Sequence, residues 1–338
     1  MQKTLLGKTG FMVSRVAFGA LPVQRVSLDV AIRILRKAYE SGINFFDTAR
    51  AYTDSEEKMG KALADVRKDI VIATKTHSKD VKTFWEHLET SLERLKTDYI
   101  DIYQFHNPKE ILSDEFKDLY LAAKDAQKKG LVRHISITSH SMDVARQAVE
   151  SGMFDTLQYP FSSLASQKDF ELTFLCKEKN MGFIAMKALA GGLLTDAEAA
   201  FAFLWQYDHV LPIWGVQKEE ELDQFIRLEK NPPPLDEKMS AKIEKDKKEL
   251  AGSFCRACGY CLPCPAGIDI PQAARMKFLL RRAPYQGFIT EQGIKNMHKI
   301  GDCIGCNLCA GRCPYNLNTP ELLKEMLKDY REFVKNHT

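Results

Sequence analysis

Short apolar runs rich in β-branched and aromatic residues recur between residue 15 and about residue 229. Each is followed by a stretch in which apolar positions repeat at helical spacing. This alternation predicts repeated strand and helix units that build a parallel sheet. Eight such units are present. The predicted strands are residues 15–19, 43–49, 69–76, 99–106, 131–138, 154–161, 181–188 and 210–215.

Eight parallel strands in about 215 residues favour a closed (β/α)8 barrel, the TIM barrel. An open, doubly wound sheet is the alternative, but no Gly-x-Gly-x-x-Gly run follows the first strand. The residues before Arg15 are expected to form a hairpin that plugs the barrel floor.

The repeating pattern stops at Asn231, where three successive prolines lack backbone donors and fix φ. We therefore expect a barrel over residues 1–231 and a linker with a connecting helix over 232–250. A second, small and mainly α-helical domain is expected over 251–338.

Composition and charge narrow the possible functions. The chain has 338 residues, of which 45% are hydrophobic and 28% charged, as in ordinary globular proteins. Its net charge of +3 arises from 48 basic and 45 acidic residues, without a basic stripe that would indicate nucleic-acid binding. The N-terminal residues lack the apolar run of a signal peptide, and no apolar run approaches the roughly 18 residues of a membrane span. We expect a cytoplasmic protein that binds neither nucleic acid nor membrane.

Eight of the nine cysteines fall within residues 255–313, in two runs. In a reducing compartment such clustering indicates metal or cluster ligation. The second run has the cysteine spacing of bacterial ferredoxins, in which the fourth cysteine binds the other cluster. We therefore predict two [4Fe-4S] clusters in a ferredoxin-like domain. One is assigned to Cys255, Cys258, Cys261 and Cys313, and the other to Cys303, Cys306, Cys309 and Cys264.

Two other interpretations of these cysteines remain open. Zinc is the main competitor, because paired Cys-x-x-Cys elements also build sites with four thiolate ligands. The first run has two residues before its fourth cysteine where the ferredoxin pattern has three. A domain with one complete cluster is therefore a further alternative.

Polar residues that end barrel strands are the candidates for catalysis, since active sites of such barrels lie at the carboxyl ends of the strands. Asp47 and Tyr52 follow the second strand, Lys75 ends the third and His106 ends the fourth. Each alone has a plain structural explanation, such as a helix cap or a packed core histidine. Together they suit reduction of a carbonyl, in which a positioned acid protonates oxygen as hydride reaches carbon.

Tyr52 is the natural acid, because a neighbouring ammonium stabilises its phenolate and lowers a pKa that is ordinarily about 10. Lys75 would supply that charge, and Asp47 would pair with Lys75. His106 would orient the substrate oxygen through a hydrogen bond.

The Asp-Thr-Ala-x-x-Tyr spacing, the Ala-Thr-Lys run and the histidine after strand four resemble the aldo-keto reductase superfamily over about residues 3–230. The resemblance implies that the four residues are its catalytic tetrad and that NADP or NAD is the cofactor. It also implies hydride transfer between that cofactor and a small carbonyl or alcohol substrate. The residues that it places at the cofactor are Thr138, Ser139, Gln158, Lys187, Leu189, Gly191, Gly215 and Lys218.

Two positions depart from the family pattern. Glu221 stands where the family usually has an arginine for the 2′-phosphate of NADPH, and Phe225 stands where it has an adenine-contacting asparagine. Lys218 is the candidate to bind the phosphate in place of that arginine. A carboxylate near the ribose would instead favour NADH.

The barrel and the cysteine runs together resemble the branch of aldo-keto reductases with a C-terminal 2[4Fe-4S] extension. One hypothesis is that the clusters relay single electrons to or from a ferredoxin or flavoprotein partner. Another is that they are purely structural or sense iron or oxygen. Hydride carries two electrons and a cubane normally one, so a direct exchange between them usually needs a flavin or a similar intermediary.

Overall fold

The computed structural model describes residues 1–250, 254–282 and 285–337. The chain divides into two compact units. The first contains Met1–Ala188 and Glu198–Ser240, and the second contains Leu189–Ala197 and Ala241–Thr338. The short segment Leu189–Ala197, named the glycine loop below, therefore groups with the C-terminal residues, although its flanking elements belong to the barrel.

All eight predicted barrel strands form, and they close into one parallel barrel in the order β10-β3-β4-β5-β6-β7-β8-β9. Closure occurs where β10 pairs with both β9 and β3. The predicted closed barrel is confirmed, and the open sheet is excluded. The strands are β3 (Ala17–Gly19), β4 (Phe45–Asp47), β5 (Val71–Thr76), β6 (Ile100–His106), β7 (Val132–Thr138), β8 (Thr156–Pro160), β9 (Gly182–Met186) and β10 (Val210–Gly215).

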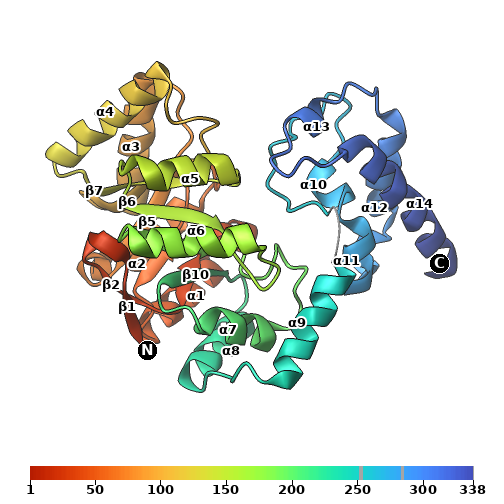
Figure 1. Ribbon diagram of the computed structural model, residues 1–338, viewed down its shortest axis with the longest axis horizontal. Helices are drawn as coiled ribbons and strands as arrows, with labels where there is room; N and C mark the ends of the chain where they lie inside the picture. Colours follow the sequence, from red (N-terminus) through yellow and green to blue (C-terminus); the bar gives the residue numbers. More distant parts are fainter. Residues whose placement is uncertain (251–253, 283–284, 338) are drawn as a thin grey trace. The chain divides into compact units, whose positions relative to one another are not determined.

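One helix follows each strand and packs outside the barrel (Figure 1). Four of these helices begin at a residue whose side chain accepts a hydrogen bond from the backbone N–H three positions on, namely Ser27, Asp80, Ser113 and Ser141. The helices are α1 (Leu28–Glu40), α2 (Ser55–Leu63), α3 (Val81–Leu95), α4 (Asp114–Lys128), α5 (Met142–Ser151), α6 (Gln167–Glu178), α7 (Ala197–Trp205) and α8 (Glu219–Lys230).

The expected N-terminal hairpin is present. Strands β1 (Lys3–Leu5) and β2 (Met12–Ser14) pair antiparallel, and the 3-10 helix η1 (Gly7–Thr9) lies between them. Leu6 and Val13 are buried in one cluster with inward-facing barrel residues such as Phe45 and Ile102. The hairpin therefore closes the end of the barrel opposite to the candidate catalytic residues.

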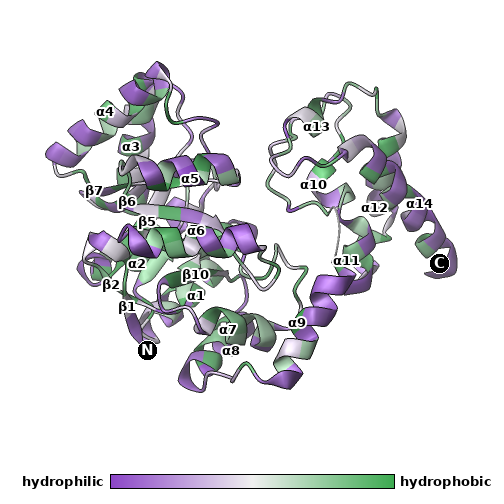
Figure 2. Cartoon of the chain, viewed as in Figure 1, coloured by the Kyte–Doolittle hydropathy of each residue, from purple (hydrophilic) through white to green (hydrophobic). Residues whose placement is uncertain are grey.

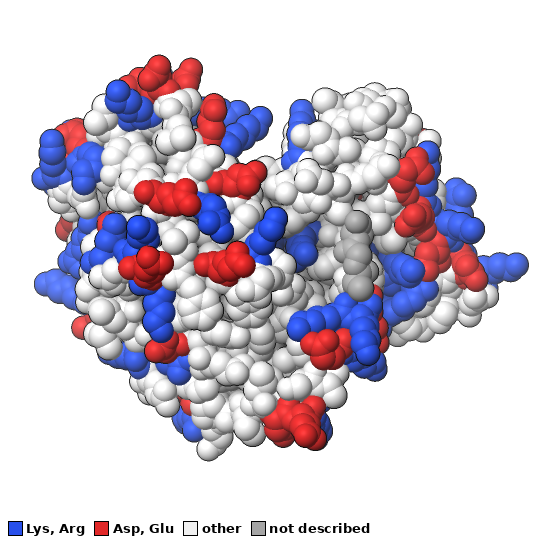
Figure 3. Space-filling view, in the orientation of Figure 1, with Lys and Arg blue, Asp and Glu red and all other residues white. Residues whose placement is uncertain are grey.

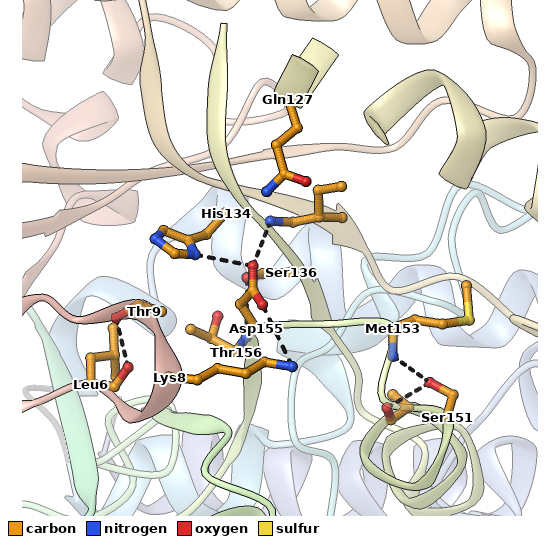
Figure 4. Close-up of polar contacts among 12 residues, drawn as sticks. Leu6, Lys8, Thr9, Gln127, His134, Ser136, Ser151, Met153, Asp155 and Thr156 are labelled. Carbon is orange, nitrogen blue, oxygen red and sulfur yellow. Dashed lines mark hydrogen bonds and ion pairs between the residues drawn. The ribbon is translucent and has the colours of Figure 1, made fainter. Parts of the chain in front are cut away.

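Asp155 ties this hairpin to two barrel strands (Figure 4). Its carboxylate lies 3.5 Å from the Lys8 ammonium of η1 and 3.0 Å from His134 Nδ1 on β7. The carboxylate also accepts a hydrogen bond from the backbone N–H of Ile135 at 3.3 Å. One half-buried acid thus links η1, β7 and the start of β8.

The C-terminal part is built from helices, as predicted. A charged helix, α9 (Glu237–Glu249), follows the prolines and is mostly hydrophilic in Figure 2. The elements that follow surround one apolar core to which Ile270, Met276, Leu323 and Tyr330 contribute. They are α10 (Ile270–Ala273), α11 (Met276–Arg282), η4 (Tyr285–Phe288), α12 (Glu291–His298), η5 (Lys299–Asp302), α13 (Leu308–Gly311) and α14 (Thr319–His337).

Basic and acidic side chains are interspersed over the face shown in Figure 3, in keeping with the nearly balanced charge of the sequence. Across the residues that the structure describes, no helix combines the length and the apolar character that a membrane span requires.

Candidate functional site

A buried ion pair lies where β4 and β5 run side by side. Asp47 ends β4, Lys75 lies near the end of β5, and both side chains are almost fully buried, at 3% and 1% exposure. Lys75 Nζ lies 2.6 Å from Asp47 Oδ2 and also donates to the backbone oxygen of Thr48 at 2.6 Å. A buried ammonium needs such partners, because an unpaired charge is costly away from water.

The other oxygen of Asp47 is bound by two amides. Asp47 Oδ1 accepts hydrogen bonds from Gln104 Nε2 at 3.1 Å and from Gln158 Nε2 at 2.8 Å. Gln158 is thus placed beside Asp47, a contact that the sequence did not predict. Gln104 was missed altogether, although it is a polar residue within the apolar strand β6 and shares a strand face with His106 two positions on.

Tyr52 lies in the turn between β4 and α2, next to Lys75. The distance from Lys75 Nζ to the centre of the Tyr52 ring is 5.1 Å. Burial raises the pKa of Tyr52 above its ordinary value, and the nearby ammonium of Lys75 acts in the opposite direction. Lys75 therefore acts to lower the pKa of Tyr52, as expected, but burial has the larger effect and the net shift is upward.

His106 ends β6 and faces Tyr52. Their ring centres are 6.0 Å apart, with the rings nearly perpendicular at 84°. Burial, with smaller contributions from the positive charge of Lys75 and from nearby His77, lowers the pKa of His106 to about 3. The imidazole is therefore neutral at ordinary pH and has one N–H with which to donate a hydrogen bond.

All four predicted catalytic residues are thus brought together at the carboxyl ends of β4, β5 and β6. Asp47 and Lys75 form the base of the site, while Tyr52 and His106 face each other above it. A phenol, an ammonium and a neutral imidazole at one point provide an acid, a charge that stabilises its conjugate base and a hydrogen-bond donor.

The predicted cofactor residues of β7 are bound by their own neighbours. Thr138 and Ser139 are each 1% exposed. Thr138 Oγ1 donates to Asn107 Oδ1 at 3.3 Å, and Ser139 Oγ donates to the backbone oxygen of Ser141 at 3.0 Å. The Ser139 bond lies within the turn that follows β7, and the Thr138 bond joins the end of β7 to the residue that follows β6.

The glycine loop and the residues just before it have an unusual backbone. Lys187, Ala190, Gly191 and Gly192 all have positive φ values, of 57°, 49°, 69° and 90°. Both glycines are exposed, and the space that a side chain at Gly192 would occupy is open for 4 Å around. A glycine backbone that is accessible in this way fits close approach by a phosphate.

The predicted cofactor residues around β10 differ in their surroundings. Gly215 ends the strand and Lys218 is exposed just before α8. The carboxylate of Glu221 accepts hydrogen bonds from the backbone N–H groups of Gln217 and Lys218, at 2.9 and 3.2 Å, and so caps α8. Phe225 is buried with its ring 4.3 Å from that of Trp214. Both departures from the family pattern therefore have structural roles here.

The eight clustered cysteines line two small cavities in the C-terminal unit. Cavity A is walled by Cys255, Cys258, Cys261 and Cys313, by the charged Arg256 and by mostly apolar residues. Cavity B is walled by apolar residues and by Cys261, Cys264, Cys303, Cys306 and Cys309. Among the residues described, no three His, Cys, Asp or Glu side chains gather closely enough to hold a single metal ion.

Left-handed residues let successive cysteines face one cavity. Ala257 and Gly259 have positive φ values between the cysteines of the first run, and Gly305 and Asn307 have them in the second. Burial, together with the neighbouring Cys255 and Cys258, raises the pKa of the Cys261 thiol to about 12. Thiols gathered in this way fit a cationic iron centre, which deprotonates its thiol ligands.

Models of known families match both parts of the chain. The aldo/keto reductase family model matches residues 15–201, and a 4Fe-4S dicluster domain model matches residues 254–318. Because the first match covers more than half of the chain, the protein belongs to the aldo/keto reductase family. It carries a C-terminal domain of the 4Fe-4S dicluster type.

Curated relatives and solved structures agree with this placement. The chain is 31% identical over 210 residues to the uncharacterized oxidoreductase YqkF of Bacillus subtilis, covering 58% of this chain and 67% of the relative. It is 33% identical over 211 residues to L-galactose dehydrogenase of Arabidopsis thaliana, covering 56% and 66%. The chain thus spans about two thirds of the length of these relatives.

Among solved structures, aldo-keto reductase AKR11C1 from Bacillus halodurans in its holo form superposes with a TM-score of 0.65. Its sequence identity to this chain is 23%, and the match covers 73% of this chain and 96% of that one. This likeness shows the fold of the barrel.

Proposed function

We propose that the protein is a NAD(P)-dependent oxidoreductase that interconverts a small carbonyl compound and its alcohol. The observation that carries the proposal is the buried ion pair of Asp47 and Lys75 beneath the facing rings of Tyr52 and His106. Membership of a reductase family supports the same reaction class.

In this mechanism Tyr52 donates its hydroxyl proton to the substrate oxygen. The ammonium of Lys75 stabilises the phenolate that remains, and Asp47 holds the ammonium in place. Neutral His106 donates a hydrogen bond that orients the same oxygen. When bound, a nicotinamide cofactor would supply the hydride. The glycine loop, Ser139 and Gln158 are the residues proposed to hold that cofactor.

The test is the variant Tyr52→Phe, which removes one hydroxyl and keeps the ring. We expect kcat to fall about a hundredfold or more, because general acid catalysis is lost, while the Kd for NADPH or NADH changes little. Tyr120→Phe is the matched control, since the Tyr120 hydroxyl donates to the backbone oxygen of Met153, away from the tetrad. Full activity in Tyr52→Phe would contradict the assignment.

Cofactor preference is proposed to depend on the start of α8. If Lys218 binds the 2′-phosphate, Lys218→Ala raises the KM for NADPH and leaves that for NADH unchanged. If the carboxylate of Glu221 binds a free ribose hydroxyl instead, wild-type protein prefers NADH. Steady-state kinetics with both cofactors separate the two cases.

We further propose that cavities A and B each hold one [4Fe-4S] cluster. Cavity A is assigned Cys255, Cys258, Cys261 and Cys313, and cavity B is assigned Cys303, Cys306, Cys309 and Cys264. Support comes from the two cavities themselves, each bordered by all four cysteines that the sequence pairs. The site requires reduced thiols, so we place the protein in the cytoplasm.

Anaerobic purification with iron, sulfide and zinc analysis tests this assignment. About eight irons per chain and the electron paramagnetic resonance of interacting reduced clusters are expected. Zinc in place of iron would overturn the cluster proposal and leave the barrel proposal intact.

A redox role of the clusters is favoured by the exposure of two cysteines of cavity B. Cys303 and Cys306 are exposed, so a cluster in cavity B would be accessible to a ferredoxin or flavoprotein partner. Adding NADH or NADPH to the oxidised protein tests the link to the barrel. Bleaching of the iron-sulfur absorbance would support electron transfer, whereas unchanged absorbance with full barrel activity would support a structural or sensing role.

A further inference from the structure

The glycine loop is bound by two arginines of the C-terminal unit. Arg275 Nη1 donates to the backbone oxygen of Gly191 at 2.9 Å, and Arg282 Nη1 donates to that of Leu193 at 2.9 Å. The partners are 84 and 89 residues apart in the sequence. The shape of the loop is therefore set by side chains from the iron-sulfur part of the chain.

Arg275 lies directly against Gly191. Gly191 has a φ of +69°, and a Cβ built on it would lie 3.2 Å from Arg275 Nη1. The same guanidinium donates from Nε to the backbone oxygen of Pro271 at 3.1 Å. The arginine is thus fixed between α10 and the loop, and a side chain at residue 191 would press against it.

Helix α9 completes the attachment. Arg282 pairs with Asp246 at 2.7 Å and with Glu249, and its side chain is only 10% exposed. Lys242 of the same helix lies 2.6 Å from the Asp196 carboxylate at the end of the loop. The pair of Arg282 and Asp246 is largely shielded from water, which strengthens its charged hydrogen bond, whereas the side chains of Lys242 and Asp196 are 34% and 30% exposed.

The segment that carries Arg275 also forms one wall of cavity A. Ile270 and Ala274 line that cavity, and Ala274 immediately precedes Arg275. The backbone N–H of Ala274 donates to the oxygen of Ile270 at 2.8 Å, so both residues belong to one helical turn. A cluster that orders the wall of cavity A therefore also orders the arginine.

From these contacts we propose that Arg275 is a positioning residue that couples occupancy of cavity A to the affinity of the glycine loop for the nicotinamide cofactor. The inference rests on the proposed function, in which the glycine loop helps to hold the nicotinamide cofactor. A loop with this backbone loses conformational freedom when it binds a ligand, and holding it in shape beforehand removes part of that cost. Coupling of this kind acts equally in both directions.

Fluorescence titration of the cluster-loaded protein with NADPH and with NADH tests the first direction. We expect Arg275→Ala to weaken binding of the preferred cofactor about tenfold, within the usual range of coupling between sites. Arg281→Ala is the matched control, because Arg281 lies on α11, the helix that begins directly after Arg275, but pairs with Asp329. The control should bind the cofactor as wild type does.

The second direction is measured by the rate at which a chelator removes iron. Saturating cofactor should slow this loss severalfold in wild type and in Arg281→Ala but not in Arg275→Ala. Equal iron content and equal melting temperatures before the assay exclude a general folding defect.

Two different failures are distinguishable. Unchanged cofactor affinity in Arg275→Ala would overturn the coupling while leaving the proposed function in place. A wild-type protein that binds neither NADPH nor NADH would overturn the proposed function, and the coupling with it.

Discussion

Gln158 and Asp47 are joined by a hydrogen bond of 2.8 Å, from the amide nitrogen to Oδ1, although 111 residues separate them. Gln104 donates to the same oxygen, so both oxygens of the aspartate are bound by fixed donors. An aspartate bound on all sides holds Lys75 in one position. The geometry under Tyr52 therefore depends on two glutamines as well as on the tetrad.

Gln104→Leu should lower kcat/KM about tenfold, because it removes one hydrogen bond to a buried charge, worth about 1.5–3 kcal/mol. Its effect on the Kd for the cofactor should be small. Gln158→Leu should lower kcat/KM similarly and should also weaken cofactor binding. Steady-state kinetics and fluorescence titration distinguish the two. Unchanged kcat/KM in both variants would show that Asp47 does not need these donors.

The pH dependence of carbonyl reduction should be flat over the neutral range. Burial lowers the pKa of His106 to about 3, so this imidazole stays neutral above that pH. Burial raises the pKa of Tyr52, so its proton remains available until alkaline pH, and the rate should fall only there. The profile of kcat/KM against pH checks this. A limb near pH 6.5 that disappears in His106→Gln would contradict it.

Asp155→Asn should destabilise the barrel at pH 7 by about 1–2 kcal/mol, because it weakens charged hydrogen bonds at the floor. Burial acts to raise the pKa of Asp155, but His134 and Lys8 outweigh this effect, and the net direction is downward. A lowered carboxyl pKa gives stability that is present above the unfolded value of about 4 and is lost as pH falls through the folded value.

The difference in melting temperature between Asp155→Asn and wild type should therefore shrink between pH 5 and pH 3. Asp65→Asn is the control, since Asp65 forms an exposed pair with Arg36. A difference in melting temperature that stays constant between pH 5 and pH 3 would show that ionisation of Asp155 does not stabilise the barrel.

Iron should leave the two cavities at different rates. Cys303 and Cys306 of cavity B are exposed, whereas Cys255 of cavity A is 8% exposed. A chelator should therefore remove about half of the iron in a fast phase, given two clusters of four irons. Cys306→Ser should abolish the fast phase and Cys258→Ser the slow one. A single phase of iron loss from the wild-type protein would contradict the predicted difference in rate between the two cavities.

The sequence predicts the barrel well because its signals are local. Each strand is a short apolar run bounded by polar residues, and all eight predicted strands form. The tetrad is predicted by the same local signal, since Asp47, Lys75 and His106 lie at or next to the ends of strands that become neighbours once the barrel closes. A parallel barrel brings the ends of adjacent strands together whatever the intervening helices contain.

The contacts that escaped prediction join residues far apart in the sequence. No local pattern indicates that Gln158 binds Asp47 or that Arg275 binds Gly191. Glu221 shows a second reason why the sequence does not predict every role. Its position matches a cofactor residue of the family, but the carboxylate caps α8, as an acid in the first turn of a helix commonly does.

The glycine loop belongs to the second unit, and this has a consequence for folding during protein synthesis. The loop is synthesised well before Lys242, Arg275 and Arg282, which bind it in the finished protein. As the chain emerges from the ribosome, the connection between β9 and α7 therefore lacks these partners until about a hundred further residues have appeared. A protein truncated after residue 240 would keep all eight strands, but its connection between β9 and α7 would lack the three side chains that bind it.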